Sequence, residues 1–121
     1  MNSTALKFHK NLKLEDWRKQ NIFGVMGNIG SEISRAIRWK NKNNETKWKE
    51  ALYRSLELFD LSIDNKNLTS AQLGELLRAR EVWVDFIFGD NTYGSSSTDI
   101  QRYFDQFAIA YQIIQLHSYG N

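Results

Sequence analysis

The 121-residue chain contains no cysteine and no proline. Without cysteine it cannot form disulfides, thiolate nucleophiles or zinc–thiolate sites. Average usage of roughly 5% would give about six prolines in a chain of this length, and their absence is typical of long uninterrupted helices joined by short turns. A chain without cysteine carries no sign of an oxidising compartment, so we expect a cytoplasmic protein.

Long apolar runs are also missing. The first ten residues lack the apolar stretch that a secretory signal requires. The uncharged segment 106–121 is interrupted by Gln112, Gln115 and His117, so it falls short of the roughly 20 apolar residues that cross a bilayer. The sequence therefore predicts no signal peptide and no membrane contact.

Histidine is scarce, and this restricts the possible chemistry. The two histidines, His9 and His117, do not stand three residues after a glutamate, as the Glu-x-x-His pairs of di-iron and di-manganese bundles require. A nucleophilic serine needs a neighbouring base, and no histidine lies on the same stretch as Ser31, Ser34 or Ser55. We therefore predict a protein that is not an enzyme and that uses no metal and no cofactor.

Hydrophobic periodicity predicts four helices preceded by a basic arm. Residues 1–14 are polar and basic without periodicity, and we expect them to form a flexible arm. Apolar residues at steps of three and four then mark one face in each of four segments, about 15–40, 43–63, 69–89 and 98 onward. Amphipathic helices joined by connections of about 3 to 8 residues are typical of an antiparallel bundle. The prediction is an all-α, up-down-up-down four-helix bundle over residues 15–121.

Capping signals define two helix starts. Thr69 followed three residues later by Gln72 forms a capping box, in which each side chain bonds the backbone N–H of the other residue. Thr98 and Gln101 repeat the pattern before the last segment. We therefore expect helices to begin directly after Thr69 and Thr98.

The third segment has one charged position on its apolar seam. The seam residues are Leu73, Leu76, Arg80, Trp83 and Ile87. Residues 82–88 are β-branched and aromatic, as in a strand, but the helical spacing runs through them unchanged, so we interpret them as helix. We expect a buried Arg80 paired with Glu32, Glu57 or Asp60, and a ligand-facing guanidinium is the alternative.

Three glycines weaken the first segment. Gly24, Gly27 and Gly30 each cost about 1 kcal/mol relative to alanine inside a helix, so the helix is either held by packing or broken near Asn28. Gly27, Gly30 and Ser34 form a small-residue strip that predicts close approach of another helix. A phosphate-binding glycine loop is disfavoured, because the segment lacks the lysine and the preceding strand of a P-loop.

Charge is segregated along the chain. Between residues 35 and 49 stand two tryptophans, Trp39 and Trp48, one acid, Glu45, and six cations, which we call the basic cluster: Arg35, Arg38, Lys40, Lys42, Lys47 and Lys49. From Glu50 to the C-terminus the sequence contains five basic and ten acidic residues. The net charge of +2 thus hides a dipolar molecule, whose positive region would attract phosphate polymers or acidic proteins.

Two interpretations of the basic cluster compete. The helix macrodipole favours cations at a helix C-terminus, which accounts for Arg38, Lys40 and Lys42. It does not account for Lys47 and Lys49, which fall in the first turns of the next predicted helix. The remaining excess of charge favours binding to the phosphate backbone of RNA or DNA. A scaffold or adaptor whose basic end meets an acidic protein is the alternative.

The last two segments carry more apolar surface than one bundle interior can hide. The third is apolar on nearly all sides beyond Glu81 except at Asp85, and the fourth is similarly broad from Ile109 to Leu116. A helix in a bundle this small normally buries a single stripe. The surplus predicts a homo-oligomer.

The combined pattern resembles a family. A basic, cysteine-free four-helix bundle of about this length resembles the accessory variability proteins of diversity-generating retroelements and the related proteins encoded within 23S ribosomal RNA intervening sequences. The blocks that read like family signatures are Asn28–Arg35, Ser55–Leu61 and Glu75–Glu81. The resemblance implies an oligomeric bundle that binds nucleic acid, with a reverse transcriptase or another protein as a partner.

Overall fold

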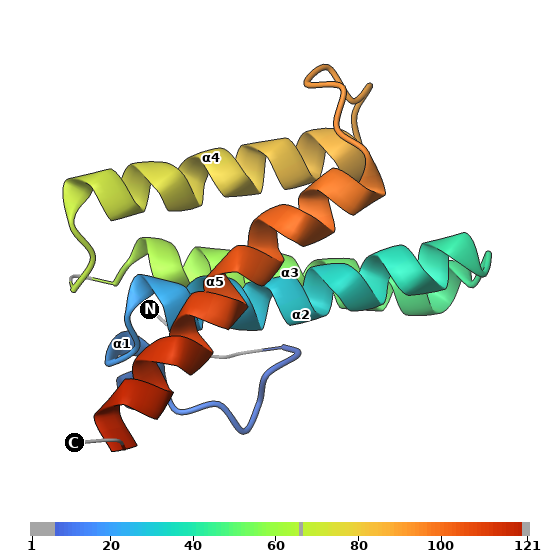
Figure 1. Ribbon diagram of the computed structural model, residues 1–121. Coiled ribbons are helices and arrows are strands. Elements are labelled where there is room, and N and C mark those ends of the chain that lie inside the picture. The colour runs from blue at the N-terminus through green and yellow to red at the C-terminus, as the bar shows by residue number, and fades with distance from the viewer. Residues whose placement is uncertain (1–6, 66, 120–121) are drawn as a thin grey trace.

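The computed structural model describes residues 7–65 and 67–119, and its regular structure there consists of five α-helices and no strand. These are α1 (Leu14–Arg18), α2 (Ile22–Asn41), α3 (Glu45–Ile63), α4 (Ser70–Ile87) and α5 (Ser97–Tyr119). The predicted all-α class is confirmed, and α4 includes most of the strand-like stretch 82–88. In Figure 1, α2 lies alongside α3, and α5 crosses α2 obliquely.

The first predicted helix is divided near its start, and of the two alternatives for its glycine-containing part, the continuous helix is present and the break near Asn28 is not. Residues 19–21 separate α1 from α2, and the Asn21 Oδ1 accepts the backbone N–H of Gly24 at 3.0 Å. Asn28 instead lies inside α2 and donates its Nδ2 to the Gly24 carbonyl at 2.9 Å. An asparagine that caps a helix fixes where the helix starts. The spacing of apolar residues alone could not predict the break at residues 19–21.

One of the two predicted capping boxes is present. Both reciprocal hydrogen bonds between Thr69 and Gln72 form at the start of α4. At α5 the prediction is wrong, because Ser96 accepts the backbone N–H of Asp99 at 3.0 Å and the helix begins at Ser97. Serine and threonine are both favoured N-cap types, so the serines preceding Thr98 made the earlier start equally favourable.

The small-residue strip on α2 is confirmed as a site of close helix contact. A methyl group added to Gly30 would stand 2.7 Å from the Cβ of Phe104, and one added to Gly27 would stand 3.4 Å from the Cα of Ala108. Both neighbours belong to α5. The absence of side chains at these glycines therefore lets α5 cross α2 at short range.

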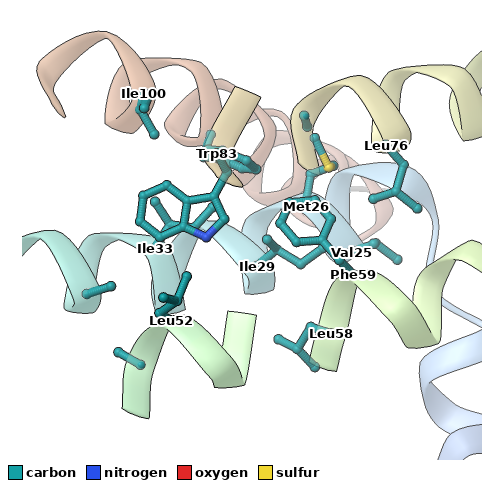
Figure 2. Close-up of a cluster of buried hydrophobic side chains, with 14 of the residues drawn as sticks. Val25, Met26, Ile29, Ile33, Leu52, Leu58, Phe59, Leu76, Trp83 and Ile100 are labelled. Atoms are coloured by element: carbon teal, nitrogen blue, oxygen red, sulfur yellow. The ribbon is translucent and has the colours of Figure 1, made fainter. Parts of the chain in front are cut away.

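The core lies where α2, α3 and α4 meet the first half of α5. Figure 2 shows Trp83 of α4 among aliphatic side chains of the neighbouring helices. The fully buried residues with the largest side chains include Val25, Met26, Ile29, Ile33, Leu52, Phe59, Leu76 and Trp83. Ile100 and Phe104 of α5 are also buried, whereas Ile109 and Leu116 are 57% and 70% exposed. The C-terminal half of α5 thus extends beyond the core.

Arg80 differs from its predicted environment. Ala79 is buried, while the Arg80 side chain is 35% exposed and its Nε lies 3.3 Å from Asp60 Oδ1 without forming a hydrogen bond. The expected burial is wrong, although Asp60 is one of the three predicted partners. A heptad count drifts from the 3.6-residue period of a straight helix, so at this one position the buried residue is Ala79, while Leu76, Trp83 and Ile87 of the predicted seam are buried.

The described part of the predicted arm is attached to α3. The backbone N–H groups of Lys7, Phe8 and His9 donate to the Glu57 carboxylate at 2.8 to 3.3 Å, and His9 Nδ1 lies 2.9 Å from Glu57 Oε1. Burial would raise the pKa of Glu57, but these hydrogen bonds together hold that pKa below its usual value. Residues 1–6 of the predicted arm lie outside the described residues.

Candidate nucleic-acid interface

A tight turn places the basic cluster at one end of the molecule. Asn43 adopts a left-handed conformation, with φ of 58°, which asparagine tolerates better than most residues. Asn44 then caps α3 by accepting the backbone N–H of Lys47 at 3.1 Å. In Figure 1 the paired ends of α2 and α3 extend past α4 and α5. The turn therefore presents its side chains to solvent.

The four lysines of the cluster lie in pairs over the two indole rings. A cation within about 6 Å of an aromatic centroid is attracted by the ring face. The distances from Nζ to centroid are 4.2 Å for Lys47 and 5.3 Å for Lys42 over Trp39, and 4.9 Å for Lys40 and 5.8 Å for Lys49 over Trp48. The fold thus gathers lysines from both helix ends around half-buried tryptophans.

Most of the positive charge in the cluster is not neutralised by carboxylates. Arg35 pairs with Glu32 at 2.5 Å, and Lys49 pairs with Glu45 at 2.6 Å, which raises the pKa of Lys49 and lowers that of Glu45. Among residues 7–65 and 67–119, no salt bridge involves the other four cations, Arg38, Lys40, Lys42 and Lys47. All four are exposed.

The structure adds Arg54 to the neighbourhood of the cluster. The Glu32 carboxylate, whose side chain is 7% exposed, accepts Arg35 Nη1 at 2.5 Å and Arg54 Nε at 2.8 Å. Arg54 also lies four residues after Glu50 on α3, and the contact between these two side chains is longer, at 3.8 Å. Arg54 lies seven residues after Lys47, which places both on one face of α3. This spacing is the sequence feature that could have identified Arg54 as part of the site.

These side chains surround a hollow between α2 and α3, which we call the α2–α3 notch. It has a volume of about 220 Å³ and is lined by Arg35, Trp39, Lys47, Glu50, Ala51 and Arg54. Three cations and one carboxylate therefore line a recess beside an indole ring. The remaining members of the basic cluster, Arg38, Lys40, Lys42 and Lys49, do not line it.

In the described ranges no three or more histidine or acidic side chains are arranged to hold a metal ion. Within that part of the chain, no helix has both the length and the apolar character needed to cross a bilayer.

The chain was compared with protein-family models, curated proteins and solved structures. No family model, no curated protein and no solved structure matched it. Its function must therefore be inferred from its own residues and their arrangement.

Proposed function

We propose that this protein is a non-enzymatic nucleic-acid-binding protein and that the basic cluster is its interface. The observation that carries the proposal is the exposure of four cations without carboxylate partners in the described structure, grouped at the end of α2, the following turn and the start of α3. Lysine and arginine that replace the counterions of RNA or DNA release those ions into solution, and this release drives sequence-independent binding.

Helix stability alone does not account for the cluster. The C-terminal dipole of α2 favours Lys40 and Lys42, but Lys47 lies at the start of α3, where the dipole repels cations. Neighbouring like charges also destabilise the folded state by mutual repulsion. A bound phosphate backbone would relieve both effects, and this supports a binding role for the arrangement.

We further propose that the four long helices form an up-down-up-down bundle and that copies associate through α5. Ile109, Ile113 and Leu116 follow one another at steps of four and three and are 57%, 50% and 70% exposed. Exposed apolar residues on one helix face are typical of protein contacts. An oligomer would repeat the basic cluster and strengthen binding through multivalency. Such an assembly would suit an accessory role beside a nucleic-acid enzyme, such as a reverse transcriptase.

Replacing Lys40, Lys42, Lys47 and Lys49 with glutamine tests the interface. We expect the affinity for RNA or DNA to fall at least about tenfold at low salt, with the salt slope reduced by roughly 0.7 to 0.9 per lost phosphate contact. Fluorescence anisotropy with labelled oligonucleotides over a salt series measures both quantities. Circular dichroism verifies that the variant remains folded.

The control makes the same change of charge elsewhere. Lys7, Lys10, Lys13 and Lys19 are exposed lysines outside the basic cluster, and their replacement by glutamine should reduce affinity less. An equal loss in both variants would indicate a general charge effect and contradict the proposed site. A wild-type protein that binds no RNA or DNA at low salt but binds an acidic protein would favour the adaptor alternative.

A further inference from the structure

We propose that the α2–α3 notch seats one phosphate of a single-stranded nucleic acid while a neighbouring base stacks on Trp39. The inference rests on the proposed function and narrows it, because it names the flexible single strand as the preferred ligand. It also assigns a role to Arg54, which lies outside the basic cluster.

A buried carboxylate fixes the two arginines of the notch. Glu32 accepts one N–H from Arg35 and one from Arg54, at 2.5 and 2.8 Å. A guanidinium has five N–H donors, and these side chains remain 47% and 32% exposed, so further donors reach solvent. Two guanidiniums held in place by one carboxylate are preorganised for phosphate, which accepts paired hydrogen bonds from arginine.

Lys47 and the size of the notch complete the phosphate site. Lys47 adds a third positive charge, and the acids that oppose the three cations are Glu50 in the lining and Glu32 behind the two arginines. The volume of about 220 Å³ is several times the roughly 30 Å³ that one water occupies in the liquid. The recess therefore has room for a phosphate group together with the water that it retains.

Trp39 gives the notch its expected preference for a single strand. Its ring lines the recess and is half-buried, with the Lys47 ammonium 4.2 Å from the centroid. Lys42 Nζ also lies 5.3 Å from this centroid, and the long side chains of both lysines can turn from the ring to bound phosphates and uncover the indole. Bases of a single strand are free to stack on an aromatic ring, whereas those of a duplex remain paired and stacked inside the helix. Stacking on Trp39 should therefore strengthen the binding of a single strand and not that of a duplex.

Binding of matched single-stranded and duplex probes tests the inference. We would measure anisotropy with a labelled oligothymidine of about 12 nucleotides and with a duplex of equal length. The wild-type protein should bind the single strand about tenfold more tightly, and Trp39→Ala should remove most of that preference while leaving duplex affinity nearly unchanged. Trp48→Ala is the matched control, since two lysines also lie over the Trp48 ring but Trp48 does not line the notch. This variant should retain the preference for the single strand.

Arg54 and Lys47 test the phosphate contact. Arg54→Gln should weaken single-strand binding several-fold, and Arg54→Lys should restore it only in part, because lysine lacks the planar fork. Since Arg54→Gln also removes a partner of buried Glu32, Lys47→Gln serves as the second variant. Lys47 has no salt bridge within the described ranges, so its loss should lower affinity without lowering the melting temperature.

The possible outcomes separate this inference from the proposed function. Equal wild-type affinity for the two probes, or a single-strand preference that survives Trp39→Ala, would overturn the notch and leave the basic cluster as a general phosphate-binding surface. Absence of binding to either probe at low salt would overturn both proposals. A single-strand preference lost in Trp39→Ala and retained in Trp48→Ala would establish the notch.

Discussion

The indole N–H of Trp83 donates a hydrogen bond of 2.9 Å to the hydroxyl of Ser55, and both residues are completely buried. The same hydroxyl donates to the Leu52 carbonyl at 2.5 Å. Seven residues further along α3, Ser62 accepts the indole N–H of Trp17 at 3.0 Å. Two serines on one face of α3 therefore accept hydrogen bonds from two buried indole N–H groups, one on α4 and one on α1. Buried polar groups with partners in this way specify how the helices pack.

Ser55→Ala should destabilise the fold, because it leaves the buried indole N–H of Trp83 without a hydrogen-bond acceptor. A buried donor that loses its only partner costs about 1 to 3 kcal/mol, and a methyl group cannot accept from the Trp83 N–H. Ser31→Ala is the control, because Ser31 is exposed and, among the described residues, its hydroxyl donates only to the Gly27 carbonyl of its own helix. Urea unfolding should show a clear loss for Ser55→Ala and little change for Ser31→Ala. Equal stabilities would contradict the role of this hydrogen bond.

Two glycines in helices should respond in opposite ways to alanine. In Gly30→Ala the new methyl group would lie 2.7 Å from the Phe104 Cβ, so α5 must shift, and we expect destabilisation by about 1 to 3 kcal/mol. In Gly74→Ala the methyl group meets no atom within 4 Å, and helix propensity should stabilise the protein by about 1 kcal/mol. Denaturant midpoints measure both. Stabilisation by Gly30→Ala would show that the helices are not in close contact there.

The Glu57 contact predicts a pH dependence of stability. The hydrogen bonds from residues 7–9 depress the pKa of Glu57 in the folded state, so ionised Glu57 stabilises that state. This stabilisation is present above the unfolded-state pKa and is lost as pH falls through the lower folded-state pKa. The stability difference between wild type and Glu57→Gln should therefore shrink from about pH 5 to about pH 3. Urea unfolding at each pH measures it.

A matched glutamate separates this effect from the titration of the other acids. Glu15 is exposed, and its carboxylate accepts no hydrogen bond from the described residues, so Glu15→Gln should show no such pH-dependent difference. Amide exchange of residues 7–9 gives an independent measure of arm attachment. If Glu57→Gln left both the pH profile and the exchange unchanged, the carboxylate would not be what holds the arm.

Features encoded by neighbouring residues were predictable, and those that depend on distant residues were not. The Thr69–Gln72 capping box lies within four residues, and helix spacing located most of the core. The lysines of the basic cluster flank one turn, so any antiparallel pairing of α2 and α3 brings them together. The link from Glu32 to Arg54 spans 22 residues, and the bond from Trp83 to Ser55 spans 28. Neither follows from a local pattern, because helix rotation about its axis decides which side chains meet.

Ile113→Asp should dissociate the proposed oligomer. Ile113 is 50% exposed on the stripe formed with Ile109 and Leu116, and burying a carboxylate in an apolar contact without a partner is strongly unfavourable. Phe86 of α4 is a less suitable position for the same change, because it is half-buried and stacks on Trp83 at 6.2 Å. Leu77→Asp is the matched control, since Leu77 is 45% exposed on α4. Light scattering at tens of micromolar should give an oligomer for wild type and Leu77→Asp and a folded monomer for Ile113→Asp. A monomeric wild-type protein would refute the association, and an oligomeric Ile113→Asp would place the contact on another face.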